Sequence, residues 1–318
     1  MGKKLLHSIL FLAGFVLLFG CFNHVFAPKN NSTDAGIHDD YAKGFLAEPA
    51  NTLDVLILGD SEVYSCVAPL KIWEEQGITA YACGTSDQKL YQAEDFLRRA
   101  FETHSPKIIF LETNILYRDH STIDVLPHRA EELFPLIRYH DRWKKLHLSD
   151  FTDKIQFSTV FQHKGYIYQT DILPADDSTY MVPSEDLVPI PSKNIRRVKD
   201  IYDFCLDHGA ELVFFSSPST VNWNYPRHNA VAQLAQQLGT DYLDMNLLTE
   251  EIPIDWQLDT RDSGDHMNYS GAEKISVFLG NYLRETALFD DKRTVPEFAA
   301  WNDALAAFHA QMETSDPA

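Results

Sequence analysis

The segment Leu53–Ser65 constrains the fold of this chain more than any other part of it. Its sequence, LDVLILGDSEVYS, starts with a run of apolar and β-branched residues and stops at Gly59-Asp60-Ser61. A segment with helical spacing follows, from about Tyr64 to Glu75. A short buried run that ends in a glycine turn and continues as a helix is typical of a parallel α/β sheet. Ser61 is therefore predicted at the carboxyl end of a strand, where open α/β sheets bind their ligands.

Apolar strands and amphipathic helices alternate along most of the remaining chain. The predicted strands are 53–58, 78–82, 107–112, 211–216 and 242–245, and the later predicted helices are 87–104, 192–208, 229–238, 270–283 and 297–312. Ser192 is expected to cap one of these helices, and Ser270 with Glu273 to form a capping box on another. The alternation predicts a flavodoxin-like α/β fold, with three α/β/α layers and a five-stranded parallel sheet in the order 2-1-3-4-5.

The alternation is lost between Leu116 and Pro191, a stretch rich in His, Asp, Tyr and Pro. It is too long for an ordinary loop, so we expect it to have structure of its own. Within it, Glu131–Leu146 has helical spacing and Gly165–Thr170 has an extended pattern. We interpret residues 116–191 as an insertion or cap after the third strand, within a domain that spans 51–318.

The N-terminal segment is basic and then almost wholly apolar. Lys3 and Lys4 precede Leu5–Ala27, which as a helix rising about 1.5 Å per residue is long enough to cross a bilayer core about 30 Å thick. Because basic flanks stay in the cytoplasm, residues 1–27 are predicted to be a single-pass transmembrane signal anchor in the cell membrane, with the rest of the chain outside. Two alternatives are lipidation at Cys21 and cleavage after Ala27 with secretion.

Residues 28–50 follow as a polar linker and lead-in segment, and Pro28–Asp40 is expected to be a flexible stalk. The net charge of −19 argues against nucleic acid as a partner and against a polybasic membrane-surface mode. Cysteines and histidines show no zinc-ligand spacing, so a zinc site is not expected. Cys66 and Cys83 follow the first two strands, and free buried thiols are favoured over a disulfide there.

Residues suited to acyl-transfer chemistry follow several of the predicted strands. Ser61 ends the first strand, Gly84 follows the second, Asn114 follows the third, and His266 lies just before the last sheet-covering helix. A serine hydroxyl becomes a nucleophile when an imidazole accepts its proton. Ser61 is therefore the candidate nucleophile and His266 the candidate base.

The imidazole also requires a carboxylate that fixes its tautomer. Asp262 and Asp265 are both candidates, and Asp262 is favoured because adjacent side chains diverge in an extended segment. A tetrahedral intermediate needs N–H donors for its oxyanion. The candidate donors are the backbone N–H groups of Ser61 and Gly84 and the side-chain amide of Asn114.

The order of these residues resembles the sequence blocks of the SGNH (GDSL-like) hydrolases. Gly59-Asp60-Ser61 corresponds to the first block, Gly84 to the second, Asn114 to the third, and His266 with a preceding aspartate to the last. The resemblance spans about 53–283, which is most of the part expected to be exported.

Three positions depart from the pattern of that family. Glu62 replaces the usual leucine after the serine, and Glu112 replaces the usual glycine two residues before the asparagine. Ser263 stands where the family usually has an aspartate three residues before the histidine, so the carboxylate has to come from a neighbouring position.

An anchored, outward-facing chain of this kind is similar to the bacterial cell-envelope branch of that family, which includes proteins of teichoic-acid D-alanylation and exopolysaccharide O-acetylation. The resemblance implies hydrolysis or transfer of an acyl ester on a cell-envelope glycopolymer, with a membrane-bound O-acyltransferase as partner. It implies no metal and no organic cofactor. Two alternatives are a secreted carbohydrate esterase or lipase on a diffusible substrate, and a non-catalytic envelope assembly protein that keeps the fold.

Overall fold

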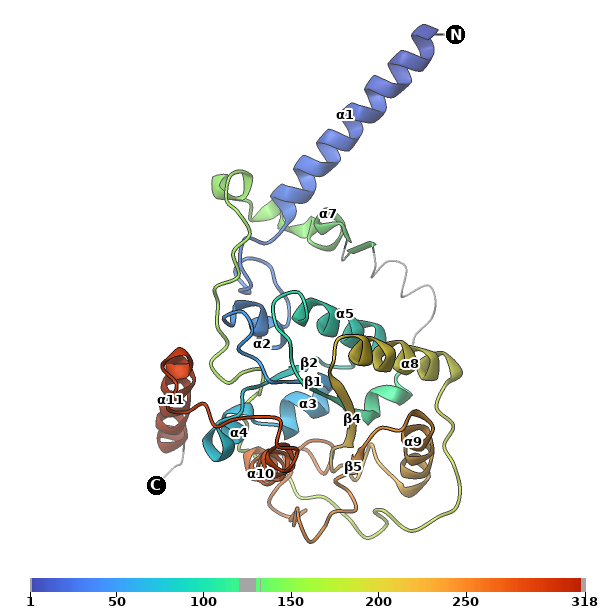
Figure 1. Ribbon diagram of the computed structural model, residues 1–318, viewed down its shortest axis with the longest axis vertical. Coiled ribbons are helices and arrows are strands. Elements are labelled where there is room, and N and C mark those ends of the chain that lie inside the picture. The colour runs from blue at the N-terminus through green and yellow to red at the C-terminus, as the bar shows by residue number, and fades with distance from the viewer. Residues whose placement is uncertain (1, 120–129, 132, 316–318) are drawn as a thin grey trace. The chain divides into compact units, whose positions relative to one another are not determined.

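The computed structural model describes residues 2–119, 130–131 and 133–315 (Figure 1). Contacts within the chain group it into two compact units. The N-terminal unit comprises Met1–Asp40 and His120–Thr159, and the α/β unit comprises Tyr41–Asp119 and Val160–Ala318.

The α/β unit is built on a five-stranded sheet in the order β2-β1-β3-β4-β5, with every neighbouring pair parallel. The strands are β1 Val55–Gly59, β2 Ala80–Gly84, β3 Ile108–Glu112, β4 Glu211–Ser216 and β5 Tyr242–Asp244. This confirms the predicted fold class and strand order. Because β1 lies between β2 and β3, the carboxyl ends of these three strands meet at one edge of the sheet.

Helices cover both faces of this sheet (Figure 1). The longer ones are α3 Ser61–Cys66, α4 Pro69–Gln76, α5 Leu90–Ala100, α8 Ser192–Asp207, α9 Tyr225–Leu238, α10 Tyr269–Glu285 and α11 Ala299–Ser315. Short helical turns are α2 Asp40–Lys43, η1 Gly44–Ala47, η2 Thr113–Tyr117 and η5 Pro296–Phe298.

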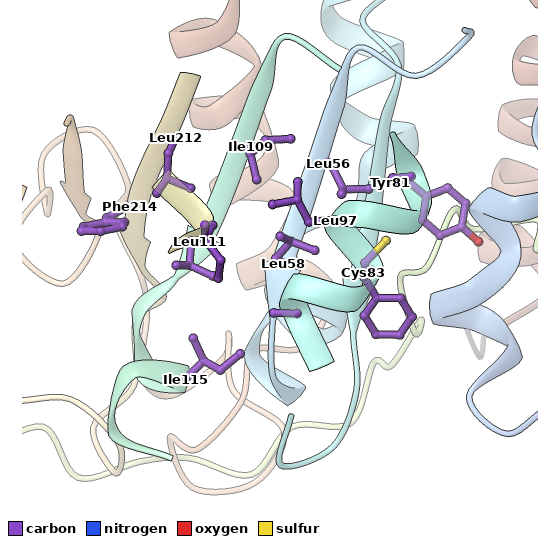
Figure 2. Close-up of a cluster of buried hydrophobic side chains, with 14 of the residues drawn as sticks. Leu56, Leu58, Tyr81, Cys83, Leu97, Ile109, Leu111, Ile115, Leu212 and Phe214 are labelled. Atoms are coloured by element: carbon purple, nitrogen blue, oxygen red, sulfur yellow. The ribbon is translucent and has the colours of Figure 1, made fainter. Parts of the chain in front are cut away.

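Each strand contributes alternate side chains to two apolar clusters, one on each face of the sheet. Figure 2 shows part of the first cluster, in which Leu56 and Leu58 of β1 lie near Ile109 and Leu111 of β3 and Leu97 of α5. The second cluster, on the opposite face, joins the strands to α3, α4 and α10 through residues such as Val55, Ile57, Val63, Ile72 and Ile275. Burial on both faces explains why the strands are continuous apolar runs in the sequence.

The helix expected over 64–75 is two helices in the structure, and the first begins earlier, at Ser61. The break falls at Val67 and Ala68, immediately before Pro69. Proline disfavours a helical conformation in the residue before it and lacks an N–H, but it is well suited to the first turn of a new helix.

Two predicted helix caps were wrong by one or two residues. Asn268, rather than Ser270, caps α10 by accepting a hydrogen bond from the Gly271 N–H. The Ser270 hydroxyl donates to Asp259 instead, at 2.7 Å. Ser192 is the first residue of α8, and Pro191 occupies the cap position.

Residues of the 116–191 insertion belong to both units. Its residues 120–129 and 132 lie outside the described residues. The expected helix Glu131–Leu146 is represented by the short α7 Pro135–Arg138 and η3 His140–Lys144, because Pro135 starts a new helix rather than continuing one. Gly165–Thr170 joins no strand, although the adjacent Lys164 carbonyl accepts a hydrogen bond from the Ala82 N–H of the edge strand β2.

The N-terminal unit contains α1 Gly2–Phe26, which is long and apolar enough to cross a membrane. It also contains α7, η3 and η4 Leu148–Phe151. The expected flexible stalk is partly fixed, because the side-chain amide of the fully buried Asn31 makes hydrogen bonds of 2.8 and 2.9 Å to the Thr159 backbone. Arg142 donates to the Phe26 carbonyl and to Asp150, at 2.8 Å each, and so ties the end of α1 to η3 and η4.

Candidate active site

Ser61 lies at the first turn of α3, directly after β1. Asp60 caps this helix, since its Oδ1 accepts a hydrogen bond from the Glu62 N–H at 3.1 Å. Gly59 and Gly84 are paired across β1 and β2, and a Cβ on Gly84 would lie 2.6 Å from the Asp60 carbonyl oxygen. Glycine at position 84 therefore allows the turn that carries Ser61 to pack directly against the neighbouring strand.

The structure brings Ser61 together with His266 and Asp262. His266 Nε2 lies 2.8 Å from Ser61 Oγ, and His266 Nδ1 lies 2.7 Å from Asp262 Oδ2. A carboxylate accepts only, so Nδ1 is assigned the proton and Nε2 is left as an acceptor for the serine hydroxyl. This is the arrangement that a general base next to a serine requires.

A compact loop before α10 holds the imidazole in place. Thr260 and Met267 form an isolated antiparallel bridge across this loop, and the Thr260 hydroxyl donates to the His266 carbonyl at 3.1 Å. Ser263 and Gly264 take positive φ angles of 61° and 90°, which turns the chain between the aspartate and the histidine. Asp262 also accepts the His266 backbone N–H at 2.6 Å, so one carboxylate fixes both the ring and the backbone of His266.

Asp265, the other candidate, lies near the same ring without hydrogen-bonding to it. Its Oδ2 is 3.7 Å from His266 Nδ1, while its Oδ1 accepts a 2.5 Å hydrogen bond from Asn222 Nδ2. The same Asn222 nitrogen donates to Glu62 Oε1 at 2.9 Å. Asn222 thus links the residue after Ser61 to the residue before His266.

Asn114 lies at the carboxyl end of β3, where the sequence places it, and is held on three sides. Its backbone N–H donates to Glu112 Oε2 at 2.9 Å, and its side-chain Nδ2 donates to Asp60 Oδ2 at 2.9 Å. Its Oδ1 accepts from Arg227 at 3.1 Å. These contacts fix which way the carboxamide faces, and one of its two amide hydrogens is engaged by Asp60. Its role as an oxyanion donor stays a prediction, as do those of the Ser61 and Gly84 N–H groups.

Three carboxyl groups, Asp60, Glu62 and Glu112, are buried around the Ser61 turn. Arg118 pairs with Asp60 at 2.7 Å. Burial, together with the charge of Asp60, raises the pKa of Glu112 to about 8. Burial first, then Asp60 and Glu112, raises the pKa of Glu62 well above its usual value. Glu62 Oε2 is buried without a hydrogen-bond partner among the described residues. Burial therefore favours the protonated form of both Glu62 and Glu112.

Sequence reasoning missed Asn222, Arg227 and Arg118, which connect the parts of the site. Asn222 lies in the polar stretch between β4 and α9, and Arg227 lies in the first turn of α9. A signal was available, because β4 ends at the same edge of the sheet as β1 and β3, and residues that follow it are placed near the site. The same signal applied to Arg118, which follows β3, although its partner Asp60 is 58 residues away.

Glu62, Asp265 and His266 form the one group of potential metal ligands found in the described part of the chain, with ligand atoms within 4.8 Å of one another. The fit to a metal is poor. Both ring nitrogens of His266 are already hydrogen-bonded, and Glu62 is 1% exposed. The described cysteines are all free thiols, with Cys66 and Cys83 buried, as expected.

No family model matches this sequence, and no curated protein matches it. Among solved structures, the chain resembles a protein from Bacteroides fragilis described as an acylhydrolase, with a TM-score of 0.39 and 12% identity over 77% of this chain and 95% of that one. It also resembles a protein of the G-D-S-L lipolytic family from Desulfitobacterium hafniense, with a TM-score of 0.40 and 9% identity over 73% and 99% of the chains. A GDSL-like lipase from Bacteroides thetaiotaomicron gives a TM-score of 0.37 and 10% identity over 73% and 88%. Because these TM-scores are low, the structural similarity does not support an inference about activity. Such an inference depends on the geometry of the site.

Proposed function

We propose that this chain is an SGNH-type serine acyl-ester hydrolase or O-acyltransferase. The observation that carries the proposal is the continuous hydrogen-bonded series from Ser61 Oγ to His266 Nε2 and from His266 Nδ1 to Asp262 Oδ2, at 2.8 and 2.7 Å. The alternative of a non-catalytic assembly protein predicts no such series, because an inactive site has no need to keep a base within reach of the serine.

In the first step, Ser61 Oγ attacks the carbonyl carbon of the ester while its proton passes to His266 Nε2. Asp262 stabilises the imidazolium that forms. The oxyanion would be stabilised by the Ser61 and Gly84 N–H groups and the Asn114 carboxamide. Collapse of the tetrahedral intermediate breaks the bond to the alkoxy group, which leaves with the proton from Nε2 and gives an acyl-serine.

In the second step, water or an alcohol attacks the acyl-serine, and His266 accepts the proton of the incoming nucleophile. The second tetrahedral intermediate expels Ser61 Oγ, which regains a proton from Nε2. Water gives hydrolysis, and a sugar or polyol hydroxyl gives transfer. The chain's own residues suffice for both steps, so the proposal involves no metal or organic cofactor.

The proposed setting is the outer face of the cell membrane, with α1 as a single-pass anchor and a cell-envelope glycopolymer as the substrate. The length and composition of α1 support this setting, as do the two lysines at its start. A membrane-bound O-acyltransferase is the proposed partner, because transfer to an external polymer needs an acyl donor that reaches the outer face.

The test is labelling of the full-length protein by a fluorophosphonate that reacts with activated serines. Wild type should label, whereas Ser61→Ala and His266→Ala should not. Ser65→Ala is a matched control, because the Ser65 hydroxyl donates to the Ser61 carbonyl rather than to His266. Equal labelling of wild type and Ser61→Ala would refute the proposal. Adding glycerol as acceptor to a p-nitrophenyl acetate assay then separates transfer from hydrolysis.

A further inference from the structure

A hollow lies on the α/β unit, beside the start of α10. It has a volume of about 550 Å³, within the range of small-molecule sites. Its walls include Tyr168, Thr170, Tyr269, Glu273 and Glu313. We call this hollow the tyrosine groove.

The tyrosine groove shares a loop with His266. Asn268 and Tyr269 line it, and they follow His266 by two and three residues. The Tyr269 N–H donates to the Gln169 carbonyl at 2.7 Å, and the Ser263 N–H donates to the Leu173 carbonyl at 3.0 Å. The wall of the groove is therefore hydrogen-bonded to the loop that carries His266, the proposed base. An extended ligand bound in the groove would contact the end of this loop.

The lining combines aromatic rings with hydrogen-bond acceptors. The rings of Tyr168 and Tyr269 are partly exposed and meet edge to face, with centroids 5.3 Å apart. Glu273 and Glu313 add carboxylate oxygens, and Thr170 adds an exposed hydroxyl. Aromatic rings pack against the C–H faces of a sugar ring, while carboxylates accept hydrogen bonds from its hydroxyl groups.

The charge of the residues that line the groove favours a neutral polymer over an anionic one. Among the described residues that line the groove, the charged ones are Glu273 and Glu313, and both are acidic. Lys71 lies 3.2 Å from Glu273 but also contacts Glu74 and Glu75, each at 3.0 Å, so its charge is more than balanced. A phosphodiester or carboxylate polymer would be repelled by this surface.

We propose that the tyrosine groove binds a segment of neutral glycan, so that the acceptor class is a neutral polysaccharide rather than a phosphate-linked polymer. This inference rests on the proposed function, because it names the acceptor that the acyl-serine would meet. Binding itself does not require a reactive Ser61, which keeps the two tests separate.

The experiment is isothermal titration of the full-length Ser61→Ala protein in a polyoxyethylene detergent, since sugar-based detergents would compete. The probes are cellohexaose, mannohexaose and N-acetylchitohexaose as neutral glycans, polyglycerol phosphate as a polyanion and laurate as an acyl chain. At least one neutral hexasaccharide should bind, and polyglycerol phosphate should not.

Two pairs of variants locate the binding. Thr170→Trp should fill the groove and weaken hexasaccharide binding about tenfold or more, whereas Thr294→Trp, on an exposed residue outside the groove, should change it by less than about twofold. Tyr168→Ala should weaken it about tenfold, and Tyr168→Phe should retain binding because the ring is kept. Thermal unfolding of each variant checks that the fold is intact.

The inference is overturned if no neutral hexasaccharide binds, if polyglycerol phosphate or laurate binds in preference, or if a folded Thr170→Trp variant binds as tightly as its parent. If wild type fails to label with fluorophosphonate but the hexasaccharide still binds through the groove, the proposed reaction is wrong and the glycan site stands. If the wild type labels with fluorophosphonate but no hexasaccharide binds in the groove, the proposed reaction stands and the glycan site is wrong.

Discussion

Replacing Asp262 and Asp265 one at a time tests which carboxylate supports His266. Asp262 Oδ2 is 2.7 Å from Nδ1, within hydrogen-bond distance, whereas Asp265 Oδ2 is 3.7 Å away and its carboxylate is held by Asn222. In Asp262→Asn, an amide N–H would face Nδ1 and move the ring proton to Nε2, which then cannot accept from Ser61. Loss of this tautomer control lowers kcat about 10⁴-fold in serine proteases, or about 5 kcal/mol.

Asp265→Asn should cost far less. A partly exposed charge that makes no hydrogen bond to the ring contributes about 1 kcal/mol or less, and the Asp265 side chain is 38% exposed. That energy corresponds to about fivefold in rate.

The assay is the pseudo-first-order rate of fluorophosphonate labelling at pH 8, with p-nitrophenyl acetate hydrolysis as a second readout. Thermal unfolding of both variants controls for loss of fold. A labelling rate of Asp265→Asn as low as that of Asp262→Asn, or an Asp262→Asn rate within about tenfold of wild type, would refute the reasoning.

Three other substitutions test buried contacts of the α/β unit. The pKa of Glu112 is raised to about 8 from an ordinary value of 4.5, so its neutral form stabilises the fold below pH 4.5 and this contribution is lost as the pH rises toward 8. Urea unfolding should therefore show that wild type loses on the order of a few kcal/mol of unfolding free energy between pH 5 and 9. Glu112→Gln should lose less over that range, although not nothing, because the pKa of the buried Glu62 is raised as well. Lys164→Met should lower the unfolding free energy by about 3–5 kcal/mol because it leaves Glu48 buried without its partner at 2.7 Å, and adding Glu48→Gln should recover part of the loss. Gly84→Ala should place a Cβ 2.6 Å from the Asp60 carbonyl and cost about 1–3 kcal/mol in urea unfolding; an unfolding free energy equal to that of wild type would show that the turn relaxes freely.

The strand order and the position of Ser61 could be predicted because they depend on local patterns. Runs buried on both faces mark parallel strands, and the glycine after β1 marks the turn to α3. The pairing of Ser61 with His266 was predictable from topology, since both lie at the edge of the sheet where strands end. The choice of Asp262 over Asp265 depends on two positive φ angles at Ser263 and Gly264, which the sequence suggests only weakly.

The topology places the loops after β3 and β4 near the site, but the individual hydrogen bonds between distant loops could not be predicted from the sequence. Asn222 and Arg227 reach residues more than a hundred positions away, and no periodic pattern encodes such pairs. The division of the insertion at Thr159 depends on contacts such as that between Asn31 and Thr159. The break before Pro69 was, in contrast, visible in the sequence as a helix-interrupting residue.

The hydrogen bonds that Asn222 makes to Glu62 and Asp265 have a consequence for how this site can evolve. A leucine at position 62 would leave the Asn222 amide with one carboxyl group as acceptor instead of two. An apolar residue at position 222 would leave two carboxyl groups near His266 without a donor between them. Each single change leaves a polar group without one of its hydrogen-bond partners, so positions 62 and 222 are expected to vary together. Relatives with a carboxyl group directly after the nucleophile should carry an amide in the loop after the fourth strand, and relatives with leucine there should not.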